Sequence, residues 1–323
     1  MTTPHDPRAR SGLRKLLGAA ALLALSAHTA HAATWLECEG NKIKWNNGWT
    51  NMYLSTTSFP AGGAWDADLQ NAMWHWNNVK GSGFNFFVGR DTDGTHAKDN
   101  GVNEMYLHST EAGSALAVTF TRYHCYWLFG YQYGIDETDI VFNNSRSWST
   151  AQLNYANLGS PFNVELVGLH ELGHAAGLKH SDGVQATMNS FYANGGPLGN
   201  SKEVDPLPDD RAGLRALYAD GTTERDVAGS ALKRTGSGTS GLISSPASAA
   251  RGSTVNVGFT FGNQGTSSQT FNIGFYLSTN NIISTGDLLL GTNTGASASA
   301  GAIGSFTRSL TIPSNVAPGT YYL

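Results

Sequence analysis

The stretch HELGHAAGLKH, at positions 170–180, brings together residue types that bind metal ions and move protons. His170 and His174 are four residues apart, so on a helix they lie on one face and can reach the same ion. Glu171 is offset from both and can contact a water molecule on that ion without binding the ion itself. A catalytic zinc usually takes three protein ligands and keeps one position open, so we expect His180 to be the third ligand.

Gly177 explains how His180 can reach an ion that the helix already holds. A glycine has no Cβ and adopts positive φ at little cost, so it can end the helix and turn the chain back. Three neutral imidazoles and a water make the tetrahedral site that zinc prefers, and zinc lowers the pKa of its bound water toward 7. With Glu171 as general base, the residues predict hydrolysis of an amide bond without a covalent intermediate. The competing interpretation, a helix with solvated or core histidines, leaves the clustering unexplained.

The elements that must position these residues follow from hydrophobic periodicity. Apolar residues recur at helical spacing in WDADLQNAMWHWNNV, which predicts an amphipathic helix before the histidine helix. FNFFVG, NEMYLHS, ALAVTFTRY and TDIVFNN are rich in aromatic and β-branched residues and predict strands. The expected helices are 65–79, 164–177 capped by Asn163, and 209–219 capped by Asp209 or Asp210. The fold class is therefore α+β.

The N-terminus predicts export. Four basic residues precede an apolar run at 16–27, and AHA at 30–32 is a small-x-small cleavage site. We therefore expect 1–32 to be a signal peptide and the mature chain to start at Ala33. The rival interpretation is a membrane anchor, but the run is shorter than the roughly 20 apolar residues that a span needs. No other stretch is long enough, so we expect a soluble secreted protein without a membrane span.

Charge and cysteine content narrow the function further. The formal net charge is −4 and no basic face is clustered, which disfavours a nucleic-acid partner. The chain has two cysteines, Cys38 and Cys125, and in an exported protein such a pair predicts one disulfide. A competing hypothesis is that Cys38 is a thiolate that blocks a metal until it is removed. It is disfavoured because a lone thiol outside the cell is exposed to oxidation.

The C-terminal third differs from the rest in amino-acid composition and in hydrophobic pattern. Residues 33–220 form the expected catalytic domain, and the small polar residues of 221–241 predict a linker. In 242–323, hydrophobic residues alternate with polar ones between short turns, which predicts an antiparallel β-sandwich. The sequence stops at GTYYL, inside an apparent strand. We therefore expect an incomplete sandwich that is truncated here or completed by another chain.

The stretch HELGHAAGLKH resembles the zinc signature of the metzincin endopeptidases, H-E-x-x-H-x-x-G-x-x-H followed by a methionine turn. Met188, in QATMNSF, matches that turn. The resemblance implies that His170, His174 and His180 bind one catalytic Zn²⁺. It also implies that Glu171 is the general base and then the acid, and that Met188 forms an apolar floor beneath the metal.

Within the metzincins the sequence is most similar to the matrixins. Ser181 directly follows the third histidine, GSALAVTFTRY resembles their edge strand, ETDIVFN their central strand, and DDRAGLRALY their C-terminal helix. The resemblance implies a twisted mixed sheet with an antiparallel edge strand and three helices. It also implies a protein or peptide substrate that binds in extended form along the edge strand. The candidate substrate-binding residues are Ala115, Leu116, Ala117 and Val118.

The C-terminal region resembles the cell-adhesion-related domain of bacterial exported proteins, through GSTVNVGFTFGNQGTSSQTFNIGFYLSTNNIISTGDLLLG and LTIPSNVAPGTYYL. The resemblance implies an immunoglobulin-like sandwich that binds a cell surface or a second chain. It motivates an alternative function, an adhesion protein whose metallo-domain is inactive or structural. The intact Glu171 argues against that alternative. A third hypothesis is another kind of zinc hydrolase, which the elongated signature disfavours.

The loop RDTDGTHAKDNG holds Asp91, Asp93, His96 and Asp99. It could hold Ca²⁺ or a second zinc, as comparable loops do in matrixins, although the order of ligands does not match an EF-hand. We favour a solvated loop.

Overall fold

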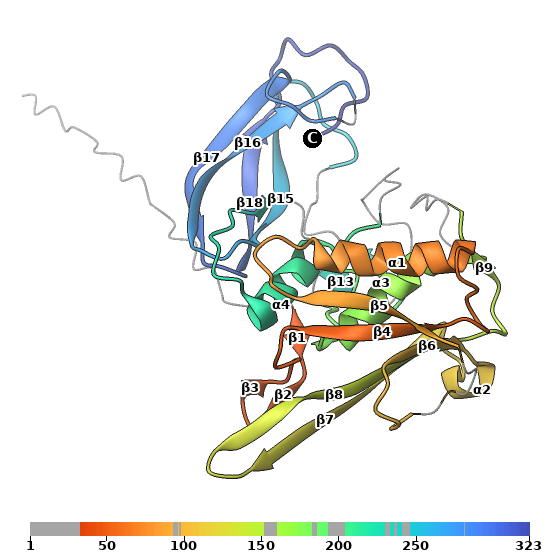
Figure 1. Ribbon diagram of the computed structural model, residues 1–323. Coiled ribbons are helices and arrows are strands. Elements are labelled where there is room, and N and C mark those ends of the chain that lie inside the picture. The colour runs from red at the N-terminus through yellow and green to blue at the C-terminus, as the bar shows by residue number, and fades with distance from the viewer. Residues whose placement is uncertain are drawn as a thin grey trace, which may run out of the picture.

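The computed structural model comprises an α/β part and a β-rich part (Figure 1). The signal peptide predicted at 1–32 lies outside the described residues. The structure describes residues 33–92, 96, 98–151, 160–182, 186–192, 204–229, 233–235, 238–240, 246–280 and 282–323.

A mixed five-stranded sheet forms the base of the α/β part, in the order β5-β4-β6-β8-β7. The first four strands in this order pair in parallel, whereas β7 pairs antiparallel with β8 and lies at the edge. The predicted mixed sheet with an antiparallel edge strand is therefore present. The strands are β4 (Trp49–Ser55), β5 (Asn85–Asp91), β6 (Glu104–Leu107), β7 (Ala117–Trp127) and β8 (Tyr131–Phe142).

The edge strand begins two residues later than we expected. Ala117 and Val118 lie in β7, but Ala115 and Leu116 precede it. The side chain of Asn143 donates to the carbonyl of Ala115, and its backbone N–H donates to the carbonyl of Leu116. These bonds keep the two residues in the turn that follows the short helix α2 (Ser109–Ala112).

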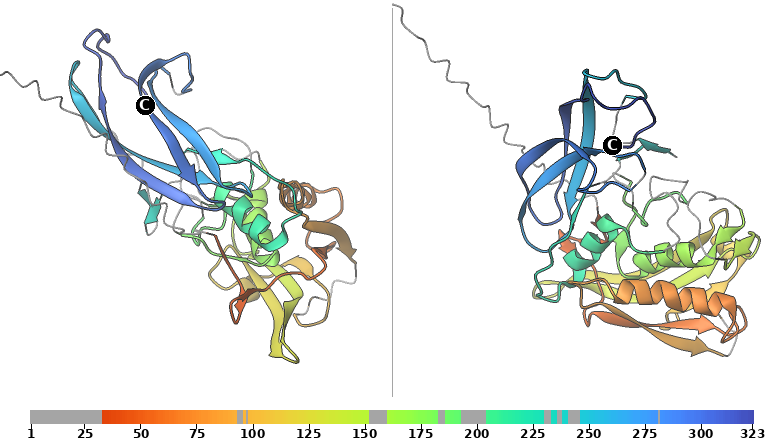
Figure 2. Two further views of the ribbon diagram at one scale, coloured as in Figure 1. Left: turned by 90° about the vertical axis from the view of Figure 1, so that its left-hand side faces the viewer. Right: turned by 90° about the horizontal axis from the view of Figure 1, so that it is seen from above.

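Helices α1 (Ala64–Asn77) and α3 (Val164–Ala175) lie side by side over the sheet (Figures 1 and 2). The indole N–H of Trp76 on α1 donates to the carbonyl of Leu169 on α3, at 2.8 Å. Gly168 allows this close approach, since a Cβ there would lie 2.9 Å from a methyl carbon of Leu69. The buried apolar face of α1 thus packs directly on the histidine helix.

The third helix, α4 (Pro208–Tyr218), starts one residue earlier than predicted. Leu207 occupies the cap position, so the prediction that Asp209 or Asp210 caps the helix was wrong. Both aspartates lie in the first turn, where the positive end of the helix dipole stabilises carboxylates. Their side chains make contacts with the candidate site, which accounts for their positions.

Short strand pairs complete this part, and the first of them joins the N-terminal segment to the chain that follows α3. They are β1 (Thr34–Trp35) with β11 (Leu178–Lys179), β2 (Glu37–Cys38) with β3 (Asn41–Lys42), and β9 (Trp148–Ser149) with β10 (Phe162–Asn163). A disulfide joins Cys38 to Cys125 on β7, which confirms the predicted pairing. It links the N-terminal segment to the β7–β8 hairpin, which projects from the sheet (Figure 1).

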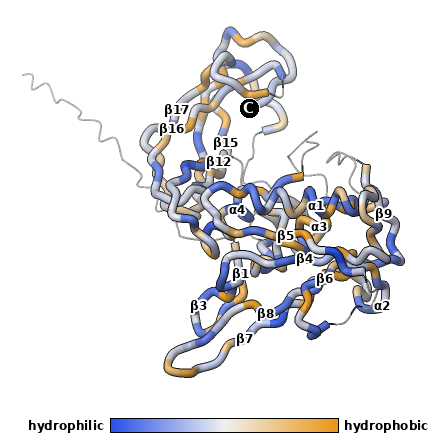
Figure 3. Tube along the Cα trace, viewed as in Figure 1, coloured by the Kyte–Doolittle hydropathy of each residue, from blue (hydrophilic) through white to orange (hydrophobic). Residues whose placement is uncertain are grey.

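The β-rich part contains two antiparallel sheets, β12-β15-β18 and β16-β17. Val257, Phe275 and Leu310 come from both sheets and form one buried cluster. Hydrophobic and hydrophilic residues are interspersed along these strands (Figure 3). The strands of this part, including one short separate pair, are β12 (Val227–Ala228), β13 (Lys233–Thr235), β14 (Gly238–Ser240), β15 (Thr254–Asn263), β16 (Gln269–Leu277), β17 (Leu288–Ala298) and β18 (Ile303–Thr311).

The two parts meet at Arg215 of α4, which is buried. Its guanidinium donates to the carbonyl of Lys80 at 2.6 Å, to the carbonyl of Gln264, and to Asp226 at 3.2 Å. Within the predicted linker, β12 pairs with β15 and so belongs to the C-terminal sheet. Among the described residues, no helix is long and apolar enough to cross a membrane.

The disulfide generates the first prediction. Replacing Cys38→Ser and Cys125→Ser together should lower the free energy of unfolding by about 2–4 kcal/mol, because a long loop is no longer closed in the unfolded chain. Chemical denaturation of the variant measures this loss. Wild type unfolded in reductant is the control and should lose a similar amount. A double variant as stable as oxidised wild type would contradict the prediction.

Candidate metal and catalytic site

Helix α3 carries the first two histidines and ends at Ala175, two residues before the predicted end at Gly177. The side chain of Asn163 accepts the N–H of Leu166 at 2.8 Å, which caps the start of the helix as expected. Ala176 is the C-cap residue, and Gly177 follows with φ of 102°. A Cβ on Gly177 would lie 3.0 Å from the carbonyl oxygen of Ile43, so the turn needs glycine for its conformation and for its space.

The chain returns after Gly177 as the short strand β11, which pairs with β1 at the N-terminus. The hydroxyl of Thr34 on β1 donates to the backbone carbonyl of His180 at 2.6 Å. The imidazole of His180 then lies 5.3 Å from that of His170 and 4.7 Å from that of His174, between ring centroids. The predicted convergence of the three rings is therefore observed.

Two backbone carbonyls set the orientation of the helix histidines. Nδ1 of His170 lies 2.7 Å from the carbonyl of Thr187, and Nδ1 of His174 lies 2.8 Å from that of Leu178. Because a carbonyl oxygen can only accept, each Nδ1 carries the proton and each Nε2 presents a lone pair. Such hydrogen bonds orient most metal-binding histidines.

The geometry of the three rings fits a zinc ion. The Nε2 atoms of His170 and His174 are 3.2 Å apart, and two nitrogens bound tetrahedrally to zinc lie about 3.3 Å apart. Possible ligand atoms of all three histidines lie within 4.8 Å of one another. Burial lowers the pKa of both His170 and His174 to about 4. Both rings are therefore neutral at pH 7, as a metal requires.

Glu171 lies beside the histidines with its side chain buried. The hydroxyl of Thr119 on β7 donates to Oε2 of Glu171 at 2.6 Å. Burial raises the pKa of Glu171, while the neighbouring His174 and the bond from Thr119 act in the opposite direction. Sequence reasoning missed Thr119. The two-residue period of a strand puts Thr119 on the face opposite Val118 and Phe120, but it could not indicate a partner 52 residues away.

Met188 lies buried beneath the histidine helix, and the turn around it is held by one carboxylate. Asp210 accepts the N–H groups of Thr187 at 2.7 Å, of Met188 at 3.0 Å and of Leu207 at 2.8 Å. Thr187 is also the residue whose carbonyl orients His170. Asp210 was expected only as a helix cap, so its contact with this turn is a second functional feature that sequence reasoning missed.

Gly173 makes room for Met188 on the underside of α3. A Cβ at Gly173 would lie 2.9 Å from Trp76 and closer still to the sulfur of Met188. Beside the turn, the hydroxyl of Ser181 donates to Asp209 at 2.7 Å. Both aspartates that begin α4 therefore bind segments that carry or support the histidines.

Two further histidines lie outside this site. His75 contacts Asp205 and Glu165, and His124 contacts Asp136.

The loop predicted to be solvated is so only in part. Asp99 is exposed, whereas the side chains of Asp91 and His96 are 10% and 15% exposed and lie 3.3 Å apart; Asp93 lies outside the described residues. Residues 193–203, which follow the methionine turn, are also outside them.

The mixed sheet, the histidine helix and the methionine turn define a metzincin-type catalytic domain. Residues 124–219 match the family model for matrixin, so this part of the chain is a matrixin domain. Human matrix metalloproteinase-25 is 34% identical over 80 residues, and mouse stromelysin-3 is 34% identical over 82. These alignments cover 25% of this chain but only 13% and 14% of the relatives.

A search of solved structures finds high choriolytic enzyme 1, a hatching enzyme zinc-protease from the medaka Oryzias latipes. It is 14% identical with a TM-score of 0.27, and the match covers 57% of this chain and 98% of that one.

Asp210 generates the second prediction. Replacing Asp210→Asn should lower the free energy of unfolding by about 1–3 kcal/mol, because the new amide N–H₂ faces backbone donors instead of accepting from them. Urea denaturation measures this change. Asp220→Asn is the matched control, since Asp220 is exposed and should tolerate the substitution. Equal stability of the two variants would show that the Asp210 contacts are not needed.

Proposed function

We propose that this protein is a secreted zinc endopeptidase of the matrixin type. The observation that carries the proposal is the pair of Nε2 lone pairs, 3.2 Å apart, beside the buried carboxylate of Glu171. Two lone pairs at this distance repel each other unless a cation lies between them. Glu171 is not needed to bind that cation, so its position supports a catalytic role over a purely structural metal site.

His170, His174 and His180 hold the zinc in this proposal. When bound there, zinc would supply a Lewis acid for a water molecule and for the carbonyl of the scissile peptide bond. Glu171 accepts the proton of that water and passes it to the leaving amine. Thr119 is a positioning residue, because its hydroxyl holds one carboxylate oxygen and leaves the other for the water. Met188 packs against the histidine helix, and Gly177 provides the turn that brings His180 back to the other two histidines.

The peptide substrate binds in extended form along β7. Among the described residues, β7 is the last strand of its sheet, so one side has backbone groups that no neighbouring strand uses. Ala117 and Val118 begin this strand, and an added peptide would bind there through its backbone. Thr119 lies next to them and contacts Glu171, so the binding edge and the catalytic carboxylate are directly connected.

The proposal extends to the organisation of the chain. Residues 1–32 are a signal peptide, 33–220 the catalytic domain, 221–241 a connecting segment that contributes β12 to the C-terminal sheet, and 242–323 an immunoglobulin-like sandwich of the cell-adhesion-related kind. The buried cluster of Val257, Phe275 and Leu310, shared by two sheets, supports a sandwich. The disulfide supports export, because disulfides persist in oxidising compartments. The sandwich would bind a cell surface or a second chain.

The role of Glu171 generates the third prediction. Glu171→Gln should keep one zinc ion on the histidines and lower kcat for casein or a peptide substrate by about 10²–10⁴-fold, since the general base is lost. Glu165→Gln is the matched control, because Glu165 lies on the same helix and contacts His75 instead. Near-wild-type cleavage by Glu171→Gln, with zinc retained, would refute the proposed function.

The contact from β7 generates the fourth prediction. Thr119→Val removes the hydroxyl at nearly constant volume and should lower kcat about 10- to 100-fold with little change in KM, through loss of a hydrogen bond to a carboxylate. Thr119→Ser should restore most of kcat, because it keeps the hydroxyl. If kcat of Thr119→Ser is as low as that of Thr119→Val, the effect comes from packing, and the positioning role of Thr119 is wrong.

A further inference from the structure

A cavity of about 560 Å³ lies on the face of the five-stranded sheet that α1 and α3 do not cover. Met52 and Leu54 of β4 are buried in the core beneath these helices. Trp49, Asn51 and Tyr53 alternate with them along the strand, so they point to the opposite face, where they line the cavity. The volume is within the range of small-molecule binding sites. The cavity is separate from the candidate catalytic site, which lies on the helix side.

Trp49 and Phe87 form an exposed aromatic patch on this face. The two residues are 42% and 53% exposed, and their ring centroids are 5.7 Å apart in a T-shaped arrangement. Exposed apolar surface is unfavourable in water, and an apolar patch bordered by polar residues is typical of a binding site. Because Trp49 also lines the cavity, the patch offers a flat apolar surface to a ligand that enters it.

Two further aromatic rings of the cavity are held in place by the fold. Gly89 of β5 is the register partner of Tyr53, and a Cβ on Gly89 would lie 2.6 Å from Cε1 of the Tyr53 ring. The ring therefore lies against the backbone of β5, in space that a larger residue would fill. The indole N–H of Trp45 donates to the carbonyl of Ala175 at 2.8 Å. Because both rings are positioned before a ligand binds, binding need not order them.

Some neutral polar groups that line the cavity are used by the protein, and others are available to a ligand. The amide of Asn103 donates to the hydroxyl of Thr50 at 2.8 Å and accepts the N–H of Thr138 at 2.8 Å. The side-chain amide of Asn51 and the hydroxyl of Tyr53 have no hydrogen-bond partner in the part of the chain that the structure describes. An amide presents donors and an acceptor side by side, and a phenol hydroxyl can donate or accept.

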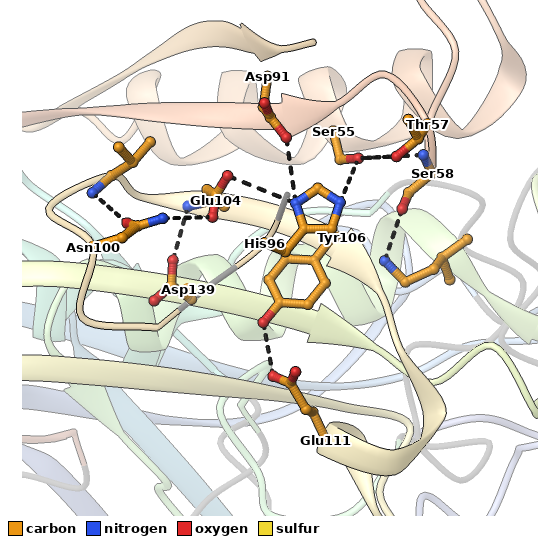
Figure 4. A network of polar contacts seen from close by, with 12 residues as sticks. Ser55, Thr57, Ser58, Asp91, His96, Asn100, Glu104, Tyr106, Glu111 and Asp139 are labelled. Atoms are coloured by element: carbon orange, nitrogen blue, oxygen red, sulfur yellow. Dashed lines mark hydrogen bonds and ion pairs between the residues drawn. The ribbon is translucent and has the colours of Figure 1, made fainter. Parts of the chain in front are cut away.

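The charged side chains that line the cavity already have partners within the protein. Figure 4 shows Asp91 and Glu104 on either side of His96, whose Nδ1 lies 3.3 Å and 3.7 Å from their carboxylate oxygens. The guanidinium of Arg90 contacts the carboxylate of Asp66 at 2.6 Å. These contacts leave neither a free cation nor a free anion to pair with a charged ligand, so the lining favours a neutral one.

We propose that this cavity binds a neutral carbohydrate, with a sugar ring stacked on Trp49 and its hydroxyls hydrogen-bonded to Asn51 and Tyr53. A sugar ring has a face of C–H groups that packs on aromatic rings and a rim of hydroxyls that pair with amides. A purely apolar ligand would leave the amide and the phenol hydroxyl unpaired, which is unfavourable. An anionic ligand would approach the carboxylates of Asp91 and Glu104 without a free cation to pair with.

The test is binding of the full-length secreted protein to an array of oligosaccharides of glucose, mannose, galactose and N-acetylglucosamine, followed by calorimetry with the strongest binder. Wild type should bind at least one of them. Trp49→Ala and Asn51→Ala should each raise its Kd about tenfold, because a stacking surface or hydrogen bonds are lost. Trp74→Ala is the matched control, since Trp74 is 59% exposed but lies on α1, on the other side of the sheet. It should bind as wild type does.

A second variant, Tyr53→Phe, removes only a hydroxyl and keeps the ring against Gly89. It should keep the melting temperature of wild type and still bind the oligosaccharide more weakly, because one hydrogen bond is lost. If wild type binds no oligosaccharide on the array, or if Trp49→Ala and Tyr53→Phe both bind as tightly as wild type, the cavity is not a carbohydrate site. Binding of acidic but not neutral sugars would overturn the choice of ligand. Sugar binding is measured without cleavage, so the result is independent of the proposed peptidase activity.

Discussion

The orientation of two imidazole rings is the interaction on which the candidate catalytic site depends. Carbonyls of Thr187 and Leu178 accept from the Nδ1 atoms of His170 and His174, so both Nε2 lone pairs face the same point. This arrangement is unfavourable for the protein alone and favourable once a cation is bound. The fold must therefore supply the energy that keeps the rings in place, and it does so through contacts to both carbonyl-bearing segments.

Those contacts come from segments at opposite ends of the domain's sequence. Asp210 on α4 holds the turn that contains Thr187 and Met188, and β1 pairs with the β11 strand that contains Leu178. Thr34 adds a bond to the carbonyl of His180. A buried carboxylate is stable only when its oxygens accept hydrogen bonds. Asp210 therefore holds the turn in place, and the N–H groups of the turn in return stabilise the buried Asp210. A substitution in α4 or β1 would therefore change the orientation of the histidine rings, although the histidines themselves are unchanged.

The sequence by itself determined the features that depend on local spacing. Helical periodicity placed His170 and His174 on one face, Gly177 marked the turn after the helix, and aromatic and β-branched residues identified the strands that include β7. The partners of buried polar groups were decided only by tertiary structure. Thr119 meets Glu171, Asp210 meets Thr187, and Trp76 meets Leu169, each through contacts between separate elements. Periodicity records which face of an element is buried, but a hydrogen bond between distant elements depends on how those faces pack, which no short stretch of sequence encodes.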